Sequence, residues 1–128
     1  MIRHHVRVIY GDTDQMGVVY YANYFRYMEA ARAEYIRAKG RSYRDIEAMG
    51  VFLPVVEAHC EYRASARYDD EVIVEATLAE MRSASLRFTY RVLRGEELLA
   101  TGHTRHACLG RDGRPTRVPA ELAVLAET

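Results

Sequence analysis

The chain has 128 residues, of which 49% are hydrophobic, and its 18 Lys and Arg residues balance 18 Asp and Glu residues. A chain of this length and apolar content predicts one domain, residues 1–128, with a single hydrophobic core. A net charge of zero provides no overall attraction for nucleic acid, so we expect no nucleic-acid partner.

Cysteine content and the first residues both favour a cytoplasmic location. Cys60 and Cys108 are too few for a disulfide framework or a zinc pattern, and we expect both to be small buried side chains. The opening residues, Met-Ile-Arg-His-His-Val-Arg, lack the apolar run of a signal peptide. No stretch approaches the roughly 20 apolar residues that span a bilayer. We therefore expect a soluble protein without a membrane span.

The first half of the chain predicts a strand at 5–10, a turn, and a long helix at 23–39. Asn23 suits the N-cap, and Gly40 suits the position just after the helix. Helical spacing predicts Glu29–Arg32 and Glu34–Arg37 ion pairs on the outer faces. The same spacing predicts one buried apolar stripe, made of Tyr24, Tyr27, Met28, Ala31, Tyr35 and Ala38.

The second half alternates apolar and polar residues with a period of two, which predicts strands. A short helix or turn at 43–49 precedes them, and a short helix is expected at 119–126. The predicted strands cover residues 56–62, 71–78, 85–92 and 98–109. Their connections are too short for parallel crossovers, so we predict a four-stranded antiparallel meander with the long helix on one face, an α+β fold. Open sheet edges favour edge-to-edge dimerisation.

Residues 10–24 carry the densest signal, Tyr-Gly-Asp-Thr-Asp-Gln-Met-Gly-Val-Val-Tyr-Tyr-Ala-Asn-Tyr. They place Asp12 and Asp14 between a strand and a helix, whose first N–H groups stabilise negative charge. Asp12 is predicted to be a turn residue that binds local backbone N–H groups. Gly17 is expected to adopt a positive φ or to allow close approach of a substrate.

This run, followed by Glu29-x-x-Arg32, resembles the signature of the hotdog-fold acyl-CoA thioesterases, in the subgroup of 4-hydroxybenzoyl-CoA thioesterase and the Tol–Pal-cluster acyl-CoA thioesterases. Tyr62-Arg-Ala-Ser-Ala-Arg-Tyr-Asp-Asp and Met81-Arg-Ser-Ala-Ser-Leu-Arg-Phe resemble that family's strand–turn–strand region. The resemblance covers about residues 3 to 120. It implies a hotdog fold, in which an antiparallel sheet wraps one long central helix, and hydrolysis of an acyl thioester.

The resemblance also implies roles for individual residues. Asp14 would be the catalytic carboxylate, acting as the nucleophile or as the general base that activates water. The backbone N–H of Tyr21 would stabilise the oxyanion, with Gly17 in the same loop. Tyr20 and Tyr24 would line the acyl pocket. Glu29 is a second candidate carboxylate, for which pairing with Arg32 is the preferred interpretation.

Coenzyme A carries phosphates that basic side chains bind. The resemblance maps these contacts to Arg82 and Ser83, with Arg63 and Arg87 as alternative cations. Only Arg82 is basic among residues 82–84, so an acyl carrier protein remains an alternative donor of the acyl group. We expect no cofactor, since the coenzyme A thioester is the substrate, and a homo-oligomer, a tetramer built as a dimer of dimers or else a dimer.

Other kinds of site find less support in the sequence. His103 and His106 are three residues apart in a strand, which places them on opposite faces, and we expect no metal site. A non-catalytic acyl-thioester binding module on the same fold is the alternative function. A hotdog dehydratase ranks below both, because those enzymes pair an acid with a histidine and no His lies between Asp12 and Arg44.

Overall fold

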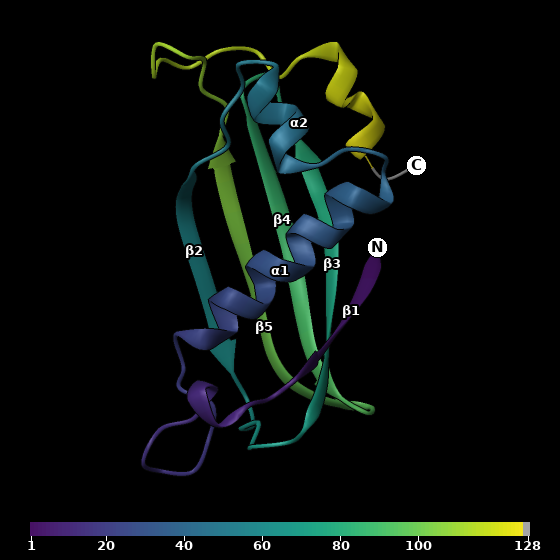
Figure 1. Cartoon of the computed structure of the whole chain (residues 1–128). Helices are drawn as coiled ribbons and strands as arrows, with labels where there is room; N and C mark the ends of the chain where they lie inside the picture. The colour runs from purple at the N-terminus through teal and green to yellow at the C-terminus, as the bar shows by residue number, and fades with distance from the viewer. Residues whose placement is uncertain (127–128) are drawn as a thin grey trace.

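The computed structural model describes residues 1–126, in which five antiparallel strands form one sheet with a long helix against one face (Figure 1). No helix in this part of the chain is long and apolar enough to cross a membrane. The elements are β1 (Ile2–Arg7), α1 (Asn23–Ala38), α2 (Tyr43–Ala48), β2 (Val55–Tyr62), β3 (Glu71–Met81), β4 (Ser85–Arg94), β5 (Glu97–Ala107) and 3₁₀ turns at Tyr10–Asp12 and Ala120–Leu125.

The strand order is β1-β3-β4-β5-β2, so the predicted four-stranded meander is wrong at one connection. Strands β3, β4 and β5 are sequential neighbours, but β2 pairs with β5 and β1 pairs with β3. Residues 63–70 carry the chain from β2, at one edge of the sheet, past β5 and β4 to β3, which is next to the other edge. Arg94 holds this segment, because its Nη1 donates to the Ser65 carbonyl at 3.1 Å and to the Asp70 carboxylate at 2.7 Å.

The first strand is also displaced from the prediction, since it ends at Arg7 rather than residue 10. Pairing with β3 stops at Arg7 opposite Glu71, and the chain then closes the 3₁₀ turn Tyr10–Asp12. This early ending brings the aspartate-containing turn to the bottom of the sheet, beside the start of α1 (Figure 1).

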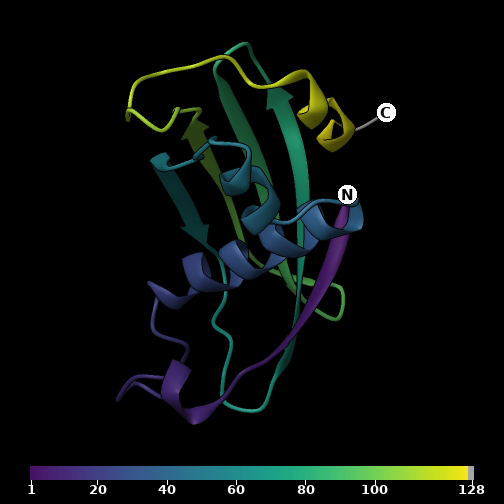
Figure 2. The ribbon, with the colours of Figure 1, turned by 45° about the horizontal axis from the view of Figure 1, so that its top comes forward.

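The alternation of apolar and polar residues predicted for β3 and β4 is confirmed, with the apolar residues facing inward. Val72, Val74, Ala76 and Leu78 from β3 and Leu86, Phe88, Tyr90 and Val92 from β4 are all buried. Figure 2 shows α1 lying against that face of the sheet. Close packing of α1 on β5 requires Gly102, because a Cβ there would lie 2.6 Å from both the Met28 Cε and the His59 carbonyl oxygen.

Most of the predicted helix is confirmed, with differences at both ends and on one side. Asn23 is the first helical residue rather than the N-cap, and Ala38 is exposed rather than part of the buried stripe. The Glu34–Arg37 ion pair forms. The Glu29–Arg32 pair does not form in the described chain, because the Arg32 side chain turns inward to Tyr43 and Tyr90.

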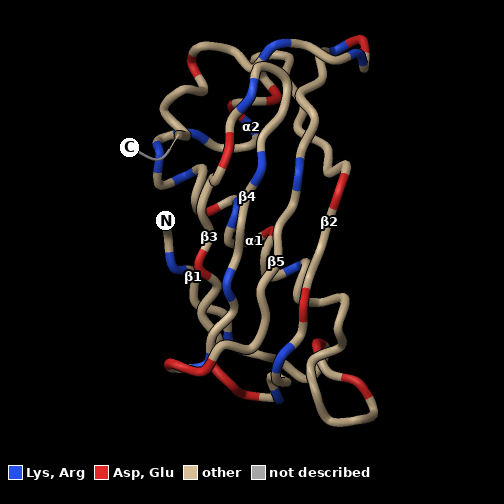
Figure 3. Tube along the Cα trace, turned by 180° about the vertical axis from the view of Figure 1, so that it is seen from behind, with Lys and Arg blue, Asp and Glu red and all other residues tan. Residues whose placement is uncertain are grey.

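The outer face of the sheet and its β2 edge remain uncovered. Figure 3 shows acidic and basic residues scattered over the outer face, where Glu75 pairs with Arg3 and Arg91 across three strands. Strand β2 is exposed on both sides of the sheet, and its apolar residues Val55, Val56 and Tyr62 are 47%, 50% and 44% exposed.

Candidate active site

The turn that leads into α1 is a short hairpin closed by a Thr13–Val19 bridge. The Asp14 N–H donates to the Val18 carbonyl at 2.9 Å, and the Gly17 N–H donates to the Asp14 carbonyl at 3.0 Å. Gly17 has a φ of 79°, a conformation that glycine adopts at little cost. The backbone of Asp14 is therefore fixed on both sides.

The Asp14 side chain is only partly engaged. Its Oδ1 accepts the Met16 N–H at 2.9 Å, and within residues 1–126 its Oδ2 accepts no hydrogen bond. The half-buried Asp14 lines a hollow of about 280 Å³, whose walls include Tyr21, Tyr24 and Tyr62. A carboxylate with one free oxygen facing a hollow can accept a proton from water or attack a carbonyl carbon.

Tyr21 lines the same hollow. Its carbonyl accepts the Tyr24 N–H at 3.3 Å and the Tyr62 hydroxyl at 2.9 Å. Its own N–H has no acceptor in the part of the chain that the structure describes, and it lies two residues before α1 begins. The structure therefore brings to one hollow Asp14 and a residue whose backbone N–H is free.

Tyrosines form the apolar wall of this hollow, and of the two that the sequence indicated Tyr24 lines it and Tyr20 does not. Tyr24 is buried, accepts the Ala66 N–H at 3.2 Å, and packs edge-on against Tyr62 with ring centroids 5.2 Å apart. Tyr20 is exposed, packs on Tyr21, and does not line the hollow. Sequence reasoning missed Tyr62 as a residue of this hollow. Burial raises the pKa of its hydroxyl. Its period-two position in an edge strand gave no signal of a site.

Arg82 and Ser83 lie far from Asp14. They follow β3, whose start is beside the aspartate turn and whose eleven residues extend about 36 Å. Arg82 forms an ion pair with Glu80, and the Ser83 carbonyl accepts the Val118 N–H at 2.7 Å. Among the cations named as alternatives, Arg63 lines the Asp14 hollow.

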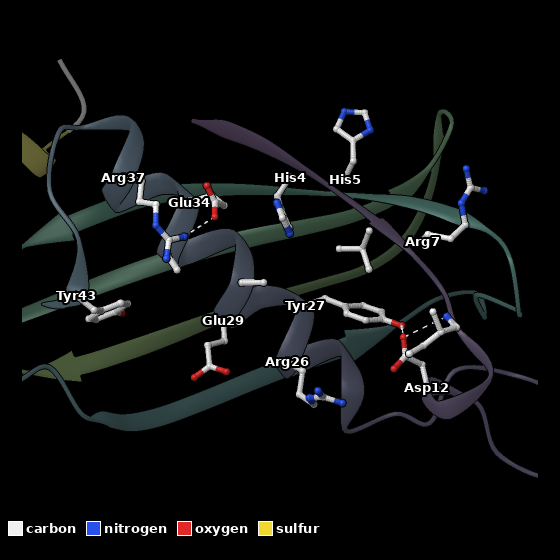
Figure 4. Close-up of a pocket in the computed structure, with 14 residues that line it drawn as sticks. His4, His5, Arg7, Asp12, Arg26, Tyr27, Glu29, Glu34, Arg37 and Tyr43 are labelled. Atoms are coloured by element: carbon white, nitrogen blue, oxygen red, sulfur yellow. Dashed lines mark hydrogen bonds and ion pairs between the residues drawn. The ribbon is translucent and has the colours of Figure 1, made fainter.

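Asp12 lies in a second and larger hollow, of about 790 Å³, between β1 and α1 (Figure 4). Only 7% of Asp12 is exposed. Its Oδ2 accepts the Tyr27 hydroxyl at 2.8 Å and the Ile9 N–H at 3.5 Å, while burial and this carboxylate raise the pKa of Tyr27. The predicted turn role is confirmed, although the main partner is a helix side chain rather than local backbone.

The Asp12 carbonyl also ties the turn to the helix, because it accepts the Tyr20 N–H at 2.8 Å and the Asn23 Nδ2 at 2.9 Å. Glu29 lines this larger hollow as an exposed residue (Figure 4). The preferred interpretation of a pair with Arg32 is wrong, because Arg32 bonds Tyr43 and Tyr90 instead. Asp12 therefore organises the turn that presents Asp14.

Comparison with known proteins places the chain in a family. The model of the thioesterase-like superfamily matches residues 8–125. The chain belongs to this superfamily. The acyl-CoA thioester hydrolase YbgC of Escherichia coli is 39% identical over 99 residues, which cover 77% of this chain and 74% of that protein.

Solved structures agree with the fold. A hypothetical protein from Thermus thermophilus is 44% identical, with a TM-score of 0.93 over 96% of this chain and 95% of its own. A mutant 4-hydroxybenzoyl CoA thioesterase complexed with 4-hydroxybenzoyl CoA is 26% identical, with a TM-score of 0.87 over 98% of each chain. The hotdog fold and the resemblance to thioesterases are thereby confirmed.

Proposed function

We propose that this chain is an acyl-CoA thioesterase in which Asp14 is the catalytic carboxylate. The observation that carries the proposal is the hollow that Asp14 and Tyr21 both line, since Asp14 has a free carboxylate oxygen and Tyr21 an unpaired N–H. Membership of the thioesterase-like superfamily and the likeness to an acyl-CoA thioester hydrolase support it.

Asp14 serves the reaction by one of two routes. In the first, its carboxylate attacks the thioester carbon, the C–S bond breaks, thiolate leaves, and water then cleaves the resulting mixed anhydride. In the second, it takes a proton from water as that water attacks the same carbon. Both release a carboxylic acid and a free thiol. An acyl adduct on Asp14 after rapid acid quenching would identify the first route.

The Tyr21 N–H stabilises the oxyanion that forms in either route. A backbone donor of this kind typically contributes about 3–4 kcal/mol of transition-state stabilisation. Gly17 supports the geometry by keeping the Asp14 loop in its turn. Tyr24, with Tyr62, forms the acyl-contacting wall, whereas Tyr20, which lies outside the hollow, packs on Tyr21. No cofactor takes part in the proposed reaction.

We further propose a homo-oligomer, a tetramer built as a dimer of dimers. The exposed β2 edge, with Val55 and Val56, supports edge-to-edge pairing. Since Arg82 and Ser83 lie at the far end of β3, they would bind the carrier of a substrate held at Asp14 of a neighbouring subunit. Two free cysteines, Cys60 and Cys108, support a cytoplasmic location.

The test is thiol release from a panel of acyl-CoAs and acyl carrier proteins. We expect turnover by the native chain and a loss of about 10²- to 10⁴-fold in kcat for Asp14→Asn. Asp112→Asn is a matched control, because its Oδ1 also accepts the N–H two residues on, at 3.0 Å, in an exposed loop. Saturable binding without thiol release would instead indicate an acyl-thioester binding module.

A further inference from the structure

Arg32 is a buried cation without an acidic partner. Only 6% of the residue is exposed. Its Nε donates to the Tyr43 hydroxyl at 2.8 Å and its Nη1 to the Tyr90 hydroxyl at 3.1 Å, and no carboxylate in residues 1–126 forms an ion pair with it. Buried charges are normally paired, because removing an isolated ion from water is costly.

One nitrogen of Arg32, Nη2, is left without a hydrogen-bond partner in the described chain. It has no hydrogen bond, whereas every fully buried side-chain nitrogen or oxygen in the described chain has a partner, so Nη2 is not enclosed. Arg32 lines a hollow of about 240 Å³, whose apolar walls include Phe25, Val55 and Ala58. Arg32, which has one free donor in Nη2, therefore brings a positive charge to the wall of an apolar hollow.

The other polar groups around this hollow leave one net positive charge. Thr104 is engaged, since its Oγ1 lies 2.7 Å from the Tyr90 hydroxyl and 2.9 Å from the His106 Nε2. Arg26 and Glu29 line the hollow with exposed side chains of opposite charge. Added to Arg32, they leave a surplus of one positive charge, which complements a single anionic group.

This hollow lies beside the Asp14 hollow, along the same pair of elements. On α1, Tyr24 lines the Asp14 hollow and Arg32 lines the second, about 12 Å further along the helix. On β2, Tyr62 lines the Asp14 hollow and Ala58 the second, about 13 Å away. Phe25, directly after Tyr24, also lines the second hollow, so the two hollows are neighbours that both lie between α1 and β2.

We propose that the Arg32 hollow binds the far end of the acyl group, and that this end carries a carboxylate or another anionic group. The inference rests on the proposed thioesterase function and names its substrate class, a monothioester of a dicarboxylic acid. In this arrangement the thioester carbon would lie at Asp14, and the acyl chain would extend between α1 and β2 to Arg32.

The first experiment compares kcat/KM for carboxylate-ended and methyl-ended acyl-CoAs of matched length, from succinyl against butanoyl to sebacoyl against decanoyl. The native chain should favour the carboxylate-ended member by about 10- to 100-fold at the length that reaches Arg32. Equal values at every length, with methyl-ended thioesters hydrolysed, would overturn the proposal and leave the thioesterase function intact.

Variants connect the preference to Arg32. Arg32→Met should abolish the ratio between the two substrates. Because that change also removes the links to Tyr43 and Tyr90 and could prevent folding, Glu29→Gln at an exposed position provides a second measurement. Glu29→Gln removes the neighbouring negative charge and should increase the ratio, by about threefold or more. An unchanged ratio in Glu29→Gln counts against the proposal.

A binding measurement tests this inference independently of the proposed thioesterase function. If no thioester of the panel is hydrolysed, the thioesterase function falls. Calorimetric titration of the Asp14→Asn chain with the same matched pairs measures the Arg32 preference without turnover. Tighter binding of the carboxylate-ended member, lost in the Asp14→Asn/Arg32→Met chain, supports the inference, and equal affinities overturn it.

Discussion

Asp12 and Asp14 are two residues apart in one turn, yet they lie in very different surroundings. Asp12 is buried between β1 and α1, where its carboxylate accepts the Tyr27 hydroxyl and its carbonyl holds the start of the helix. Asp14 lines the neighbouring hollow with one carboxylate oxygen free. The contrast shows that partners and burial, rather than residue type or motif position, separate a structural carboxylate from a candidate catalytic one.

The largest expected effect is that substitution of Asp14 lowers activity, whereas substitution of Asp12 lowers stability. Asp14→Asn should lower kcat by about 10²- to 10⁴-fold and change the free energy of unfolding by less than about 0.5 kcal/mol. Asp12→Asn should instead cost about 1–3 kcal/mol of stability, because a buried hydrogen-bonded carboxylate is replaced. Thiol release and urea unfolding of both variants measure the two effects. Equal activity losses at equal stability would remove the distinction between the aspartates.

The buried side chain of His106 should make the free energy of unfolding depend on pH. His106 is 1% exposed, with Nδ1 donating to the Leu53 carbonyl at 2.9 Å, and burial lowers its pKa from 6.5 to about 4. Below pH 6.5 the unfolded chain takes up a proton that the folded chain refuses until about pH 4. The free energy of unfolding should therefore fall by about 3 kcal/mol as pH decreases through this window.

Urea unfolding at several pH values between 4 and 7 measures this contribution. His106→Gln should flatten the slope between pH 4 and 6.5, whereas His59→Gln, at an exposed position, should retain it. A slope that survives in His106→Gln would assign the acid sensitivity to other groups.

The link between Asp12 and Tyr27 can be isolated by a double-mutant cycle. Tyr27→Phe removes the hydroxyl that the Asp12 carboxylate accepts at 2.8 Å, leaving that carboxylate with only the long contact to the Ile9 N–H. With Asp12→Asn as the second change, we expect a coupling energy of about 1–2 kcal/mol. Urea unfolding of the four chains gives the value, and additive effects would show that the contact contributes nothing of its own.

The sequence predicted the parts of this molecule that local periodicity determines. The alternation around Val74 and Phe88 identified the buried faces of β3 and β4, and the spacing of Tyr27, Met28 and Tyr35 identified the buried stripe of α1. The motif around Asp14 was recognisable because its residues are contiguous. In each case the signal lies within a few residues of the feature that it predicts.

Features that depend on which strands are neighbours could not be predicted this way. A period of two indicates the faces of a strand but not its partner, so β2 was placed next to β3 rather than β5. Tyr62 reaches the Asp14 hollow only through that arrangement. Arg32 was assigned to an outer helix face because its spacing from Glu29 favoured an ion pair, and only tertiary contacts with Tyr43 and Tyr90 hold it inside.

The smallest expected effect concerns the loop that presents Asp14. Gly17 has a φ of 79°, so Gly17→Ala should cost about 1 kcal/mol of stability. Gly113 is a matched control, since its φ is 77° and it lies in the loop of Asp112, away from the hollow. Gly113→Ala should lose a similar amount of stability and keep its activity.

Gly17→Ala should in addition lower kcat/KM, because its N–H closes the turn on the Asp14 carbonyl and relief of strain there would shift the carboxylate. Comparing the two variants at equal loss of stability separates a positional effect on Asp14 from general destabilisation. Equal activities in the two chains would show that Asp14 tolerates movement of its loop. The contrast between a fixed Asp12 and an open Asp14 would then rest on their hydrogen-bond partners alone.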